Sequence, residues 1–317
     1  MAQKHQGLNR RKNPQSKLRR IRGDWQLYLL LLPGLIWFIV FAYKPMYGLK
    51  IAFYDYNVFG GFAKSDFIGL ENFRRYLSSP DFSRTFVNTI MIAVWQLIIV
   101  FPASILLAII VTEASSKFIS RATQTVTFLP YFISAVVVAG MVVNFTSPTY
   151  GVINQMREKL GMEPIYFMVE PDYFRPIYTI MILWMSAGYN SIVYIAAIMG
   201  IDPSLYEAAT VDGAGRFGRL WHVTLPGILP TIMTMLLLNI GKMIRSGYET
   251  IILLYQPTTF SKADTIATYA YRLAFDNRGR ADYGLAGAVG LFEAVIALVM
   301  VALANQASKR LTQNSLW

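Results

Sequence analysis

Residues 87–111 read VNTIMIAVWQLIIVFPASILLAIIV, and this stretch decides the class of the fold. It holds no charged residue, and it is longer than the roughly 20 apolar residues that cross the ~30 Å hydrocarbon core of a bilayer as a helix. Such a helix satisfies all of its own backbone polar groups, and neighbouring helices make an internal proline such as Pro102 tolerable. The stretch therefore predicts a transmembrane helix.

Similar apolar runs recur along the chain, which is 55% hydrophobic and only 15% charged. Soluble domains carry about 25% charged residues. The first run follows a long basic tail and exceeds the apolar region of a cleavable signal peptide, so we expect it to be retained. The sequence predicts an all-α membrane protein with six transmembrane helices, at roughly 25–43, 87–111, 122–145, 176–199, 223–245 and 283–304.

Composition excludes several kinds of chemistry. The chain has no cysteine, which excludes a disulfide, a thiolate nucleophile and an iron–sulfur cluster. Its only two histidines are His5 and His222, so we expect no metal site. The net charge of +11 is concentrated in residues 1–24, where eight Lys and Arg face one acid. A basic tail beside a span is a topology signal that also contacts anionic lipid, and we expect no nucleic-acid partner.

Charge placement predicts the orientation. With the N-terminus inside, the cytoplasmic segments are 1–24, 112–121, 200–222 and 305–317, and they hold 14 Lys and Arg against 5 acids. The remaining loops hold 13 Lys and Arg against 12 acids. Short segments next to spans dominate the positive-inside rule. We therefore expect both the N- and the C-terminus to be cytoplasmic.

Four segments organise the chain. A basic cytoplasmic tail occupies 1–24, and the first transmembrane helix with a long external loop occupies 25–86. Within that loop, apolar residues at helical spacing in 69–77 predict an amphipathic surface helix, either a cap over the bundle or a partner contact. A core of five transmembrane helices fills 87–304, and a cytoplasmic tail fills 305–317. The apolar positions of the surface helix are Leu70, Phe73, Tyr76 and Leu77.

The loop 202–226 between the fourth and fifth predicted spans includes EAATVDGAGRFGRLWHVTLP, residues 207–226. Asp202 followed by Pro203 is a typical helix start, and Gly213 can adopt the left-handed conformation that ends a helix. Ala208 and Ala209 leave a bare surface that another protein can approach closely. The pattern thus predicts a short helix, a glycine turn and a second helix that enters the membrane, with charge at the rim from Glu207 and Asp212.

This loop resembles the EAA motif of ABC-importer permeases, which runs Glu-Ala-Ala, three residues, Gly, nine residues, Ile, one residue, Leu-Pro. Gly213 and the closing Leu225 and Pro226 have the required spacing, whereas Val223 replaces the usual Ile. The resemblance implies that the helix from Glu207 to Gly213 docks in a cleft of an ATPase. The coupling residues it implies are Glu207, Ala208, Ala209, Asp212, Gly213, Leu225 and Pro226.

Further stretches are similar to carbohydrate-importer permeases of the LplB type, on the MalF side of the maltose-importer superfamily. That family implies the type I ABC-importer permease fold in the bacterial inner membrane and an oligosaccharide or polysaccharide-fragment cargo. It also implies a heterodimer with a second permease, two ATPase subunits that bind ATP and Mg, and an extracellular or periplasmic solute-binding protein. The stretches that carry the resemblance are 43–48, 51–57, 69–73, 248–251, 263–266, 268–272 and 316–317.

Polar residues inside the fourth and fifth spans predict a transport pathway, because they are costly in a membrane and need a role. Aromatic rings stack on sugar faces, and amides and hydroxyls bond to sugar hydroxyls. Bonding between the helices themselves is the competing interpretation. The candidate pathway residues are Trp184, Ser186, Tyr189, Asn190, Asn239, Lys242, Met243 and Ser246.

Glu293 in the sixth span is an acid that either pairs with Lys242 or carries protons, and pairing is the interpretation we favour because a relay needs titratable neighbours. The chain has no phosphate-binding loop, zinc-protease motif or nucleophile elbow. We therefore expect a subunit that is not an enzyme, has no catalytic residues, binds no cofactor and leaves ATP hydrolysis to its partners. Two alternatives are a self-contained secondary transporter and a membrane-embedded carbohydrate-active enzyme.

Overall fold

The computed structural model describes residues 25–114, 116–245, 247–275 and 281–312. The basic tail 1–24, the pathway candidate Ser246 and the terminal Leu316–Trp317 pair lie outside the described residues. The chain divides into two compact units, Met1–Lys50 and Ile51–Trp317. In the first unit, α2 (Trp25–Trp37), the π-helix η1 (Phe38–Tyr43) and α3 (Lys44–Met46) run on without a break and then enter η2 (Tyr47–Phe53). All of α2 and nearly all of η1 are exposed.

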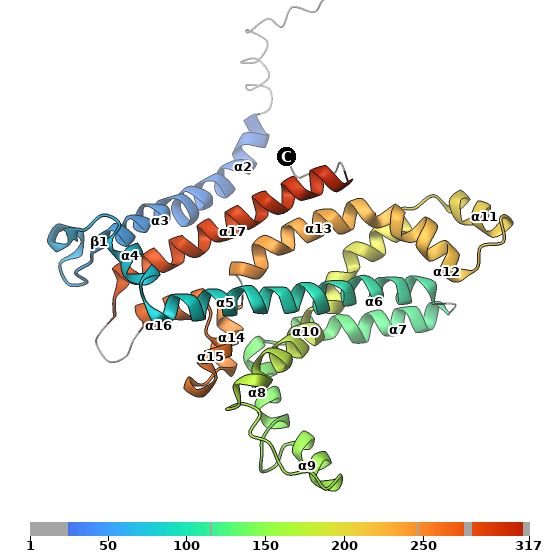
Figure 1. Ribbon diagram of the computed structural model, residues 1–317. Helices are drawn as coiled ribbons and strands as arrows, with labels where there is room; N and C mark the ends of the chain where they lie inside the picture. Colours follow the sequence, from blue (N-terminus) through green and yellow to red (C-terminus); the bar gives the residue numbers. More distant parts are fainter. Residues whose placement is uncertain (1–24, 115, 246, 276–280, 313–317) are drawn as a thin grey trace, which may run out of the picture. The chain divides into compact units, whose positions relative to one another are not determined.

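Long apolar helices dominate the second unit (Figure 1), which confirms the predicted class. Among the described residues of the whole chain, five helices are long and apolar enough to cross a membrane, and six if a bent pair counts as one span. They cover Trp25–Phe53, Pro80–Glu113, Pro171–Met199, Arg216–Ile244 and Tyr283–Lys309. In element terms, the four of the second unit are α5 (Pro80–Trp95) with η4 (Gln96–Val100) and α6 (Phe101–Glu113), α10 (Pro171–Met199), α12 (Arg216–Arg219) with η6 (Leu220–Thr224) and α13 (Leu225–Arg245), and α17 (Tyr283–Thr312).

The third predicted span, 122–145, is not one straight helix, and this part of the prediction is wrong. Helix α7 (Lys117–Phe128) continues into the 3-10 turn η5 (Leu129–Phe132), and the chain then bends by 99° into α8 (Ala135–Phe145). Pro130 lies in the 3-10 turn, and Ile133 takes an extended backbone. The Ser134 hydroxyl accepts a bond from the Val136 N–H and so starts the next helix. The break arises because the first helix ends at Ile133 and the cap of the next helix follows at Ser134.

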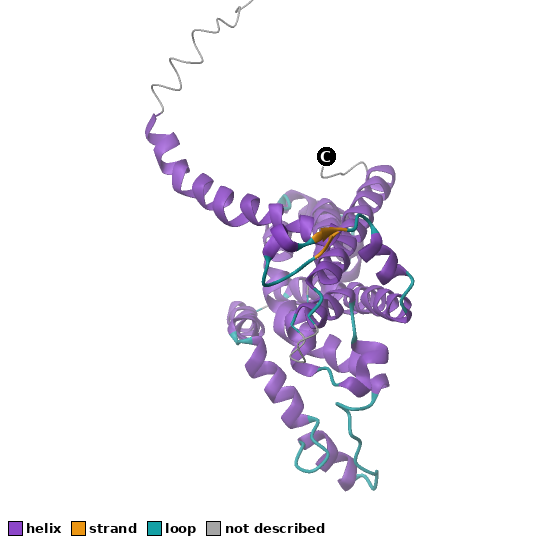
Figure 2. Ribbon diagram, turned by 90° about the vertical axis from the view of Figure 1, so that its left-hand side faces the viewer, coloured by secondary structure: helices purple, strands orange, loops and turns teal. Residues whose placement is uncertain are grey.

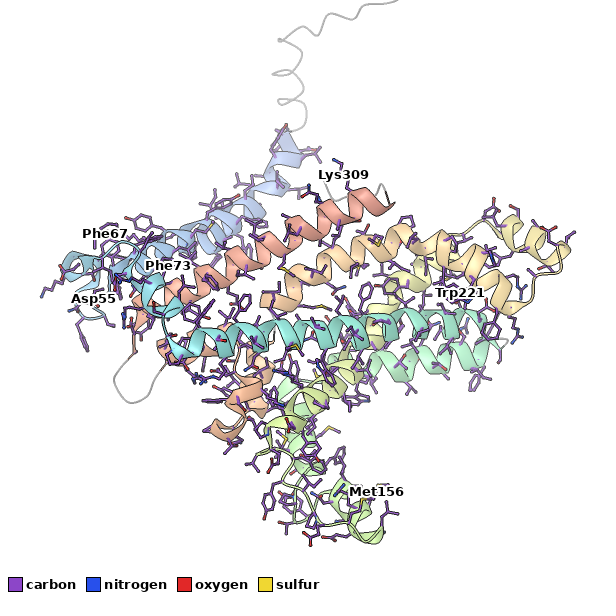
Figure 3. The ribbon with its side chains drawn as sticks, in the orientation of Figure 1. Asp55, Phe67, Phe73, Met156, Trp221 and Lys309 are labelled. Carbon is purple, nitrogen blue, oxygen red and sulfur yellow. The ribbon has the colours of Figure 1, made fainter. Side chains whose placement is uncertain are left out.

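The remaining elements are short. Strands β1 (Tyr54–Asp55) and β2 (Asp66–Phe67) pair antiparallel around η3 (Gly61–Lys64), and Figure 2 shows how small this pair is beside the helices. In Figure 3, Asp55 and Phe67 of these strands lie at one end of the unit and Trp221 of η6 at the other. The other short elements are α4 (Glu71–Leu77), α9 (Val152–Lys159), α11 (Pro203–Val211), α14 (Tyr248–Leu254), η7 (Pro257–Thr259), α15 (Phe260–Ala263) and α16 (Ile266–Ala274).

The predicted helix in 69–77 exists as α4, but its buried face differs from the predicted stripe. Leu70 and Leu77 are exposed, whereas Asn72 and Tyr76 are buried. The Tyr76 ring packs on those of α5, α16 and α17, and its hydroxyl bonds to Thr85 at 2.8 Å. Burial raises the pKa of Tyr76 to about 12. Helix α4 is therefore anchored to the bundle by a tyrosine at its centre.

Asp264 joins three helices of the second unit. Its carboxylate is fully buried and accepts hydrogen bonds from both terminal nitrogens of Arg272, at 2.7 and 2.8 Å. It accepts a third hydrogen bond from Arg84 of α5 at 3.0 Å. The Asn88 amide bonds to the Asp264 carbonyl, and Arg175 of α10 bonds to the Asn88 side-chain oxygen at 2.7 Å. Breaking a buried ion pair is strongly destabilising, because it leaves a buried charge without a partner. This network fixes the ends of α5, α10 and α16 to one another.

Helix α7 packs tightly against α10 at Gly188. A Cβ built on Gly188 would collide with the backbone of Thr127 and Phe128. We therefore expect Gly188→Ala to lower the midpoint of thermal unfolding in detergent by several degrees, since overpacking costs about 1–3 kcal/mol. Gly140→Ala in α8 is the matched control, because its Cβ would meet nothing within 4 Å. Equal midpoints for the two variants would contradict the packing described here.

Candidate functional site

The loop between α10 and α13 has the predicted local structure. The Asp202 carboxylate accepts the Ser204 N–H at 2.9 Å and caps α11, with Pro203 in the first turn. The bonds from Ser204 hold the pKa of Asp202 below its ordinary value. Glu207, Ala208 and Asp212 are exposed, and Ala209 is half-buried. Helix α11 therefore offers its Glu-Ala-Ala segment to the surroundings.

Gly213 ends α11 as predicted. Its φ of +79° is left-handed, the Gly213 N–H bonds to the Thr210 carbonyl, and the Ala214 N–H bonds to the Ala209 carbonyl at 2.9 Å. These two bonds form a Schellman motif, which glycine favours because it has no Cβ. The chain then turns into α12 and reaches Leu225 and Pro226 at the start of α13.

Two side-chain contacts connect α11 to the helix that follows the turn. The Tyr206 hydroxyl lies 3.0 Å from the hydroxyl of Thr224, which is buried in the π-turn η6. Arg219 Nη1 lies 3.4 Å from the Thr210 hydroxyl, and Arg219 Nε is buried with no hydrogen-bond partner among the described residues. The first of these contacts joins α11 to η6, the π-helix that leads into α13.

An open groove of about 360 Å³ runs along α11. It is lined by Tyr206, Glu207, Thr210, Val211 and Arg219. Apolar side chains beside it are strongly exposed: Val211 at 87% and Phe217 at 79%. Exposed apolar side chains beside a groove mark a surface that contacts another protein or the membrane.

The predicted pathway residues do not form one site. Asn190, Asn239 and Met243 share a small cavity between α6, α10 and α13 with Ser104 and Tyr194. Its volume of about 20 Å³ holds one water, not a sugar. The Asn239 amide also donates to the Met235 carbonyl of its own helix at 2.8 Å. This cavity therefore has no room for a sugar.

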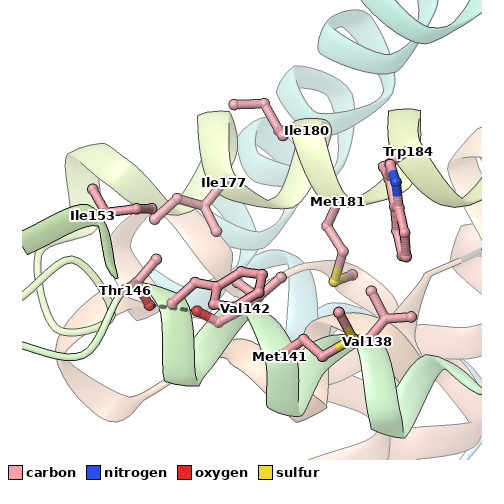
Figure 4. A pocket seen from close by; sticks show the side chains of 10 residues that line it. Val138, Met141, Val142, Thr146, Ile153, Ile177, Ile180, Met181 and Trp184 are labelled. Atoms are coloured by element: carbon pink, nitrogen blue, oxygen red, sulfur yellow. Dashed lines mark hydrogen bonds between the residues drawn. The ribbon is translucent and has the colours of Figure 1, made fainter. Parts of the chain in front are cut away.

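Trp184 instead lines an apolar pocket of about 380 Å³ between α8 and α10 (Figure 4). Val138 and Met181 lie near the indole, while Thr146 and Ile153 lie at the opposite end. The Thr146 hydroxyl donates to the Val142 carbonyl at 2.8 Å, so it is satisfied within α8. The pocket offers contact area but few free polar groups.

Tyr189 has a partner that sequence reasoning missed. Its ring stacks on that of Tyr131 with centroids 3.7 Å apart and planes 4° apart, and both residues are more than 40% exposed. Tyr131 lies in η5, at the break between α7 and α8. The prolyl turn at Pro130 was visible in the sequence, but the 99° bend that brings Tyr131 to α10 was not. The pair forms an open aromatic surface.

The other candidates are placed separately. The Ser186 hydroxyl donates to the Ile182 carbonyl of its own helix at 2.7 Å. Lys242 is exposed and Glu293 is buried, and the ion pairs among the described residues do not join them. The preferred pairing of Glu293 with Lys242 is therefore not formed in this structure.

Comparison with known proteins gives consistent matches. A model of the family described as "Binding-protein-dependent transport system inner membrane component" matches residues 101–313. Protein LplB of Bacillus subtilis (strain 168) is 37% identical over 94% of this chain and 92% of its own length. The polygalacturonan/rhamnogalacturonan transport system permease protein YteP of the same organism is 38% identical over 92% of this chain and 90% of its own.

Solved structures agree. A chain in the crystal structure of a bacterial ABC transporter involved in the import of the acidic polysaccharide alginate matches with a TM-score of 0.85 and 45% identity. The match covers 94% of this chain and 99% of that one. A second structure, of the bacterial alginate ABC transporter in complex with an alginate pentasaccharide-bound periplasmic protein, matches equally well.

Proposed function

The chain belongs to the family of binding-protein-dependent transport system inner membrane components and is a non-catalytic permease subunit of a sugar ABC importer. On that premise we propose that it carries an oligosaccharide or polysaccharide fragment across the bacterial inner membrane by alternating access. Family membership favours this function over a self-contained secondary transporter or a membrane-embedded enzyme. The exposed groove along α11 is the observation that carries the proposal.

Coupling to ATP is proposed to occur through α11. An ATPase cleft would cover Val211, and the exposed Glu207 at the groove would bond to it. Movement of α11 would pass through the Tyr206–Thr224 contact into η6 and α13. ATPase closure changes the permease only if docking contacts differ between the two states. In this arrangement ATP and Mg are bound by the partners, and both termini of the chain are cytoplasmic.

The remaining partners follow from the same function. The matched transporter structure that includes a periplasmic protein supports a solute-binding protein on the side opposite to α11. The exposure of Tyr131, Tyr189 and Trp184, all on membrane helices, supports a second permease subunit facing them. We propose that the pathway runs along that face and opens the closed cavity at Asn190 and Asn239 in another state.

Co-purification tests the assembly. The tagged chain, expressed with its neighbouring genes, should carry along a second permease and two copies of an ATPase, and in liposomes the complex should import a saccharide only with ATP and a solute-binding protein. Mass spectrometry and native mass measurement give the composition. A lone chain that transports or turns over substrate would overturn the proposal.

Gly213→Pro should uncouple transport from ATP hydrolysis. Proline cannot adopt φ +79° and removes the N–H that bonds to Thr210, so the end of α11 must change. Because couplings between sites are typically worth 5–150-fold, we expect uptake per ATP hydrolysed to fall by about tenfold while part of the assembly survives. Gly215→Ala is the control, since its φ is −70° and a Cβ there meets nothing within 4 Å. Normal ATP-dependent uptake by Gly213→Pro would refute the coupling role.

Tyr189→Ala and Asn239→Ala should each lower uptake and substrate-stimulated ATPase activity by roughly three- to tenfold, as expected for the loss of one stacking or hydrogen-bond contact. Thr234→Ala is the matched control, because the exposed Thr234 hydroxyl bonds to the Pro230 carbonyl four residues back, as Asn239 bonds to Met235. If both test variants behave like the control, these residues do not line the pathway.

A further inference from the structure

Lys242 is a charged residue within a membrane-spanning helix that the bundle does not neutralise. Its side chain is exposed, and it forms no ion pair with any residue in the part of the chain that the structure describes. Charged residues in spans are rare and mark ion or substrate pathways, or extend to the interface when they lie near a helix end. Lys242 is three residues from the end of α13, so it could line a pathway or extend to the membrane interface.

The direction of Lys242 favours the pathway. At about 100° per residue, position 242 lies within about 20° of position 235, two turns earlier on the same face of α13. Met235 lines the polar cavity with Asn239 and Asn190. The face that packs on α17 is different: a Cβ on Gly241 would meet Val301 Cγ2 of α17 at 2.8 Å. Lys242 therefore continues the cavity face of α13 and not the face buried against α17.

The distance of Lys242 along α13 gives its position in the proposed pathway. Lys242 is 17 residues beyond Leu225, about 26 Å of helix at 1.5 Å per residue. It thus lies near the end of the span that is remote from α11, above the cavity in which Asn190 and Asn239 meet. A solute arriving from that end would meet the ammonium group before the amides.

We propose that Lys242 recognises a carboxylate of an acidic saccharide and so makes this permease selective for uronic acid oligomers. The proposal rests on the proposed function and names its substrate class. The lysine ammonium offers three donors and no acceptor, which suits a carboxylate, while the amides of Asn190 and Asn239 can bond to hydroxyls. Charge-assisted hydrogen bonds are roughly twice as strong as neutral ones, so one such contact separates acidic from neutral sugars.

The test measures equilibrium binding to the assembled transporter without its solute-binding protein. The probes are a uronic acid oligosaccharide of defined length and the same oligosaccharide with its carboxyl groups reduced to alcohols. The Kd of the wild-type complex should be lower for the acidic probe. Lys242→Met should raise that Kd about tenfold and leave the reduced probe unaffected, because a hydrogen bond to a charged group is worth at least a factor of ten. Lys242→Arg should retain most of the preference.

Lys159→Met is the control for loss of one exposed lysine elsewhere, on α9. It should leave both Kd values unchanged, and raising the salt concentration should reduce the preference of the wild type. Equal binding of the two probes by the wild type, or an unchanged preference in Lys242→Met, overturns the proposal and assigns Lys242 to the lipid interface. ATP-driven import of any saccharide in liposomes, measured in parallel, separates that outcome from failure of the proposed function. If Lys242→Met fails to assemble, Lys242→Gln and the salt dependence of the wild type decide the question.

Discussion

The structure depends on one constraint: in an apolar medium every backbone N–H and C=O must find a partner within the protein. Long helices meet it along most of the second unit. The few interruptions are the positions where that unit departs from regular bonding, and each has a local solution. Ser134 caps the helix that follows the 99° break, and Gly213 closes α11 with two bonds to orphan carbonyls. The turn after α11 and the bend that brings Tyr131 to α10 are two of these interruptions, whereas Asn190, Asn239 and Lys242 lie within the long helices.

Two kinds of contact make the ends of the second unit behave differently. Remote from α11, the buried Asp264 carboxylate and its two arginines fix α5 and α16 together, and Asn88 extends the network to α10. At α11 the contacts are few, a hydroxyl pair and one long arginine bond. A buried ion network resists separation far more than exposed hydrogen bonds do. The contacts that hold the helices at the Asp264 end are thus stronger than those that hold α11.

The sequence predicted most of the spans and the local structure of the loop 202–226 because both depend on local signals. Charge-free length fixed the helices, and Asp202, Pro203 and Gly213 fixed the bounds of α11 through capping and left-handed geometry. The predictions failed where distant residues decide. The break at Ile133 needs the full 3-10 turn before it, the burial of Asn72 follows from its bonds to the Ala52 and Tyr54 carbonyls, and the Asp264 network joins residues 180 positions apart. Periodicity contains no information on such pairings.

The predicted pathway residues lie partly in a small closed cavity and partly on the exposed surface of this chain. The cavity at Asn190 and Asn239 admits a single water, and both amides lie inside the bundle. Tyr189 and Trp184 are exposed on the same helix, and Lys242 continues the cavity face of α13 to the exterior. Aromatic residues stay exposed on lipid without cost, but a lysine does not. The charge therefore indicates that this face of α13 meets water or a polar solute, and a water-filled space beside a single bundle needs a second wall. In the proposed assembly a partner permease opposite α10 and α13 would supply that wall, and Lys242 would lie on its rim.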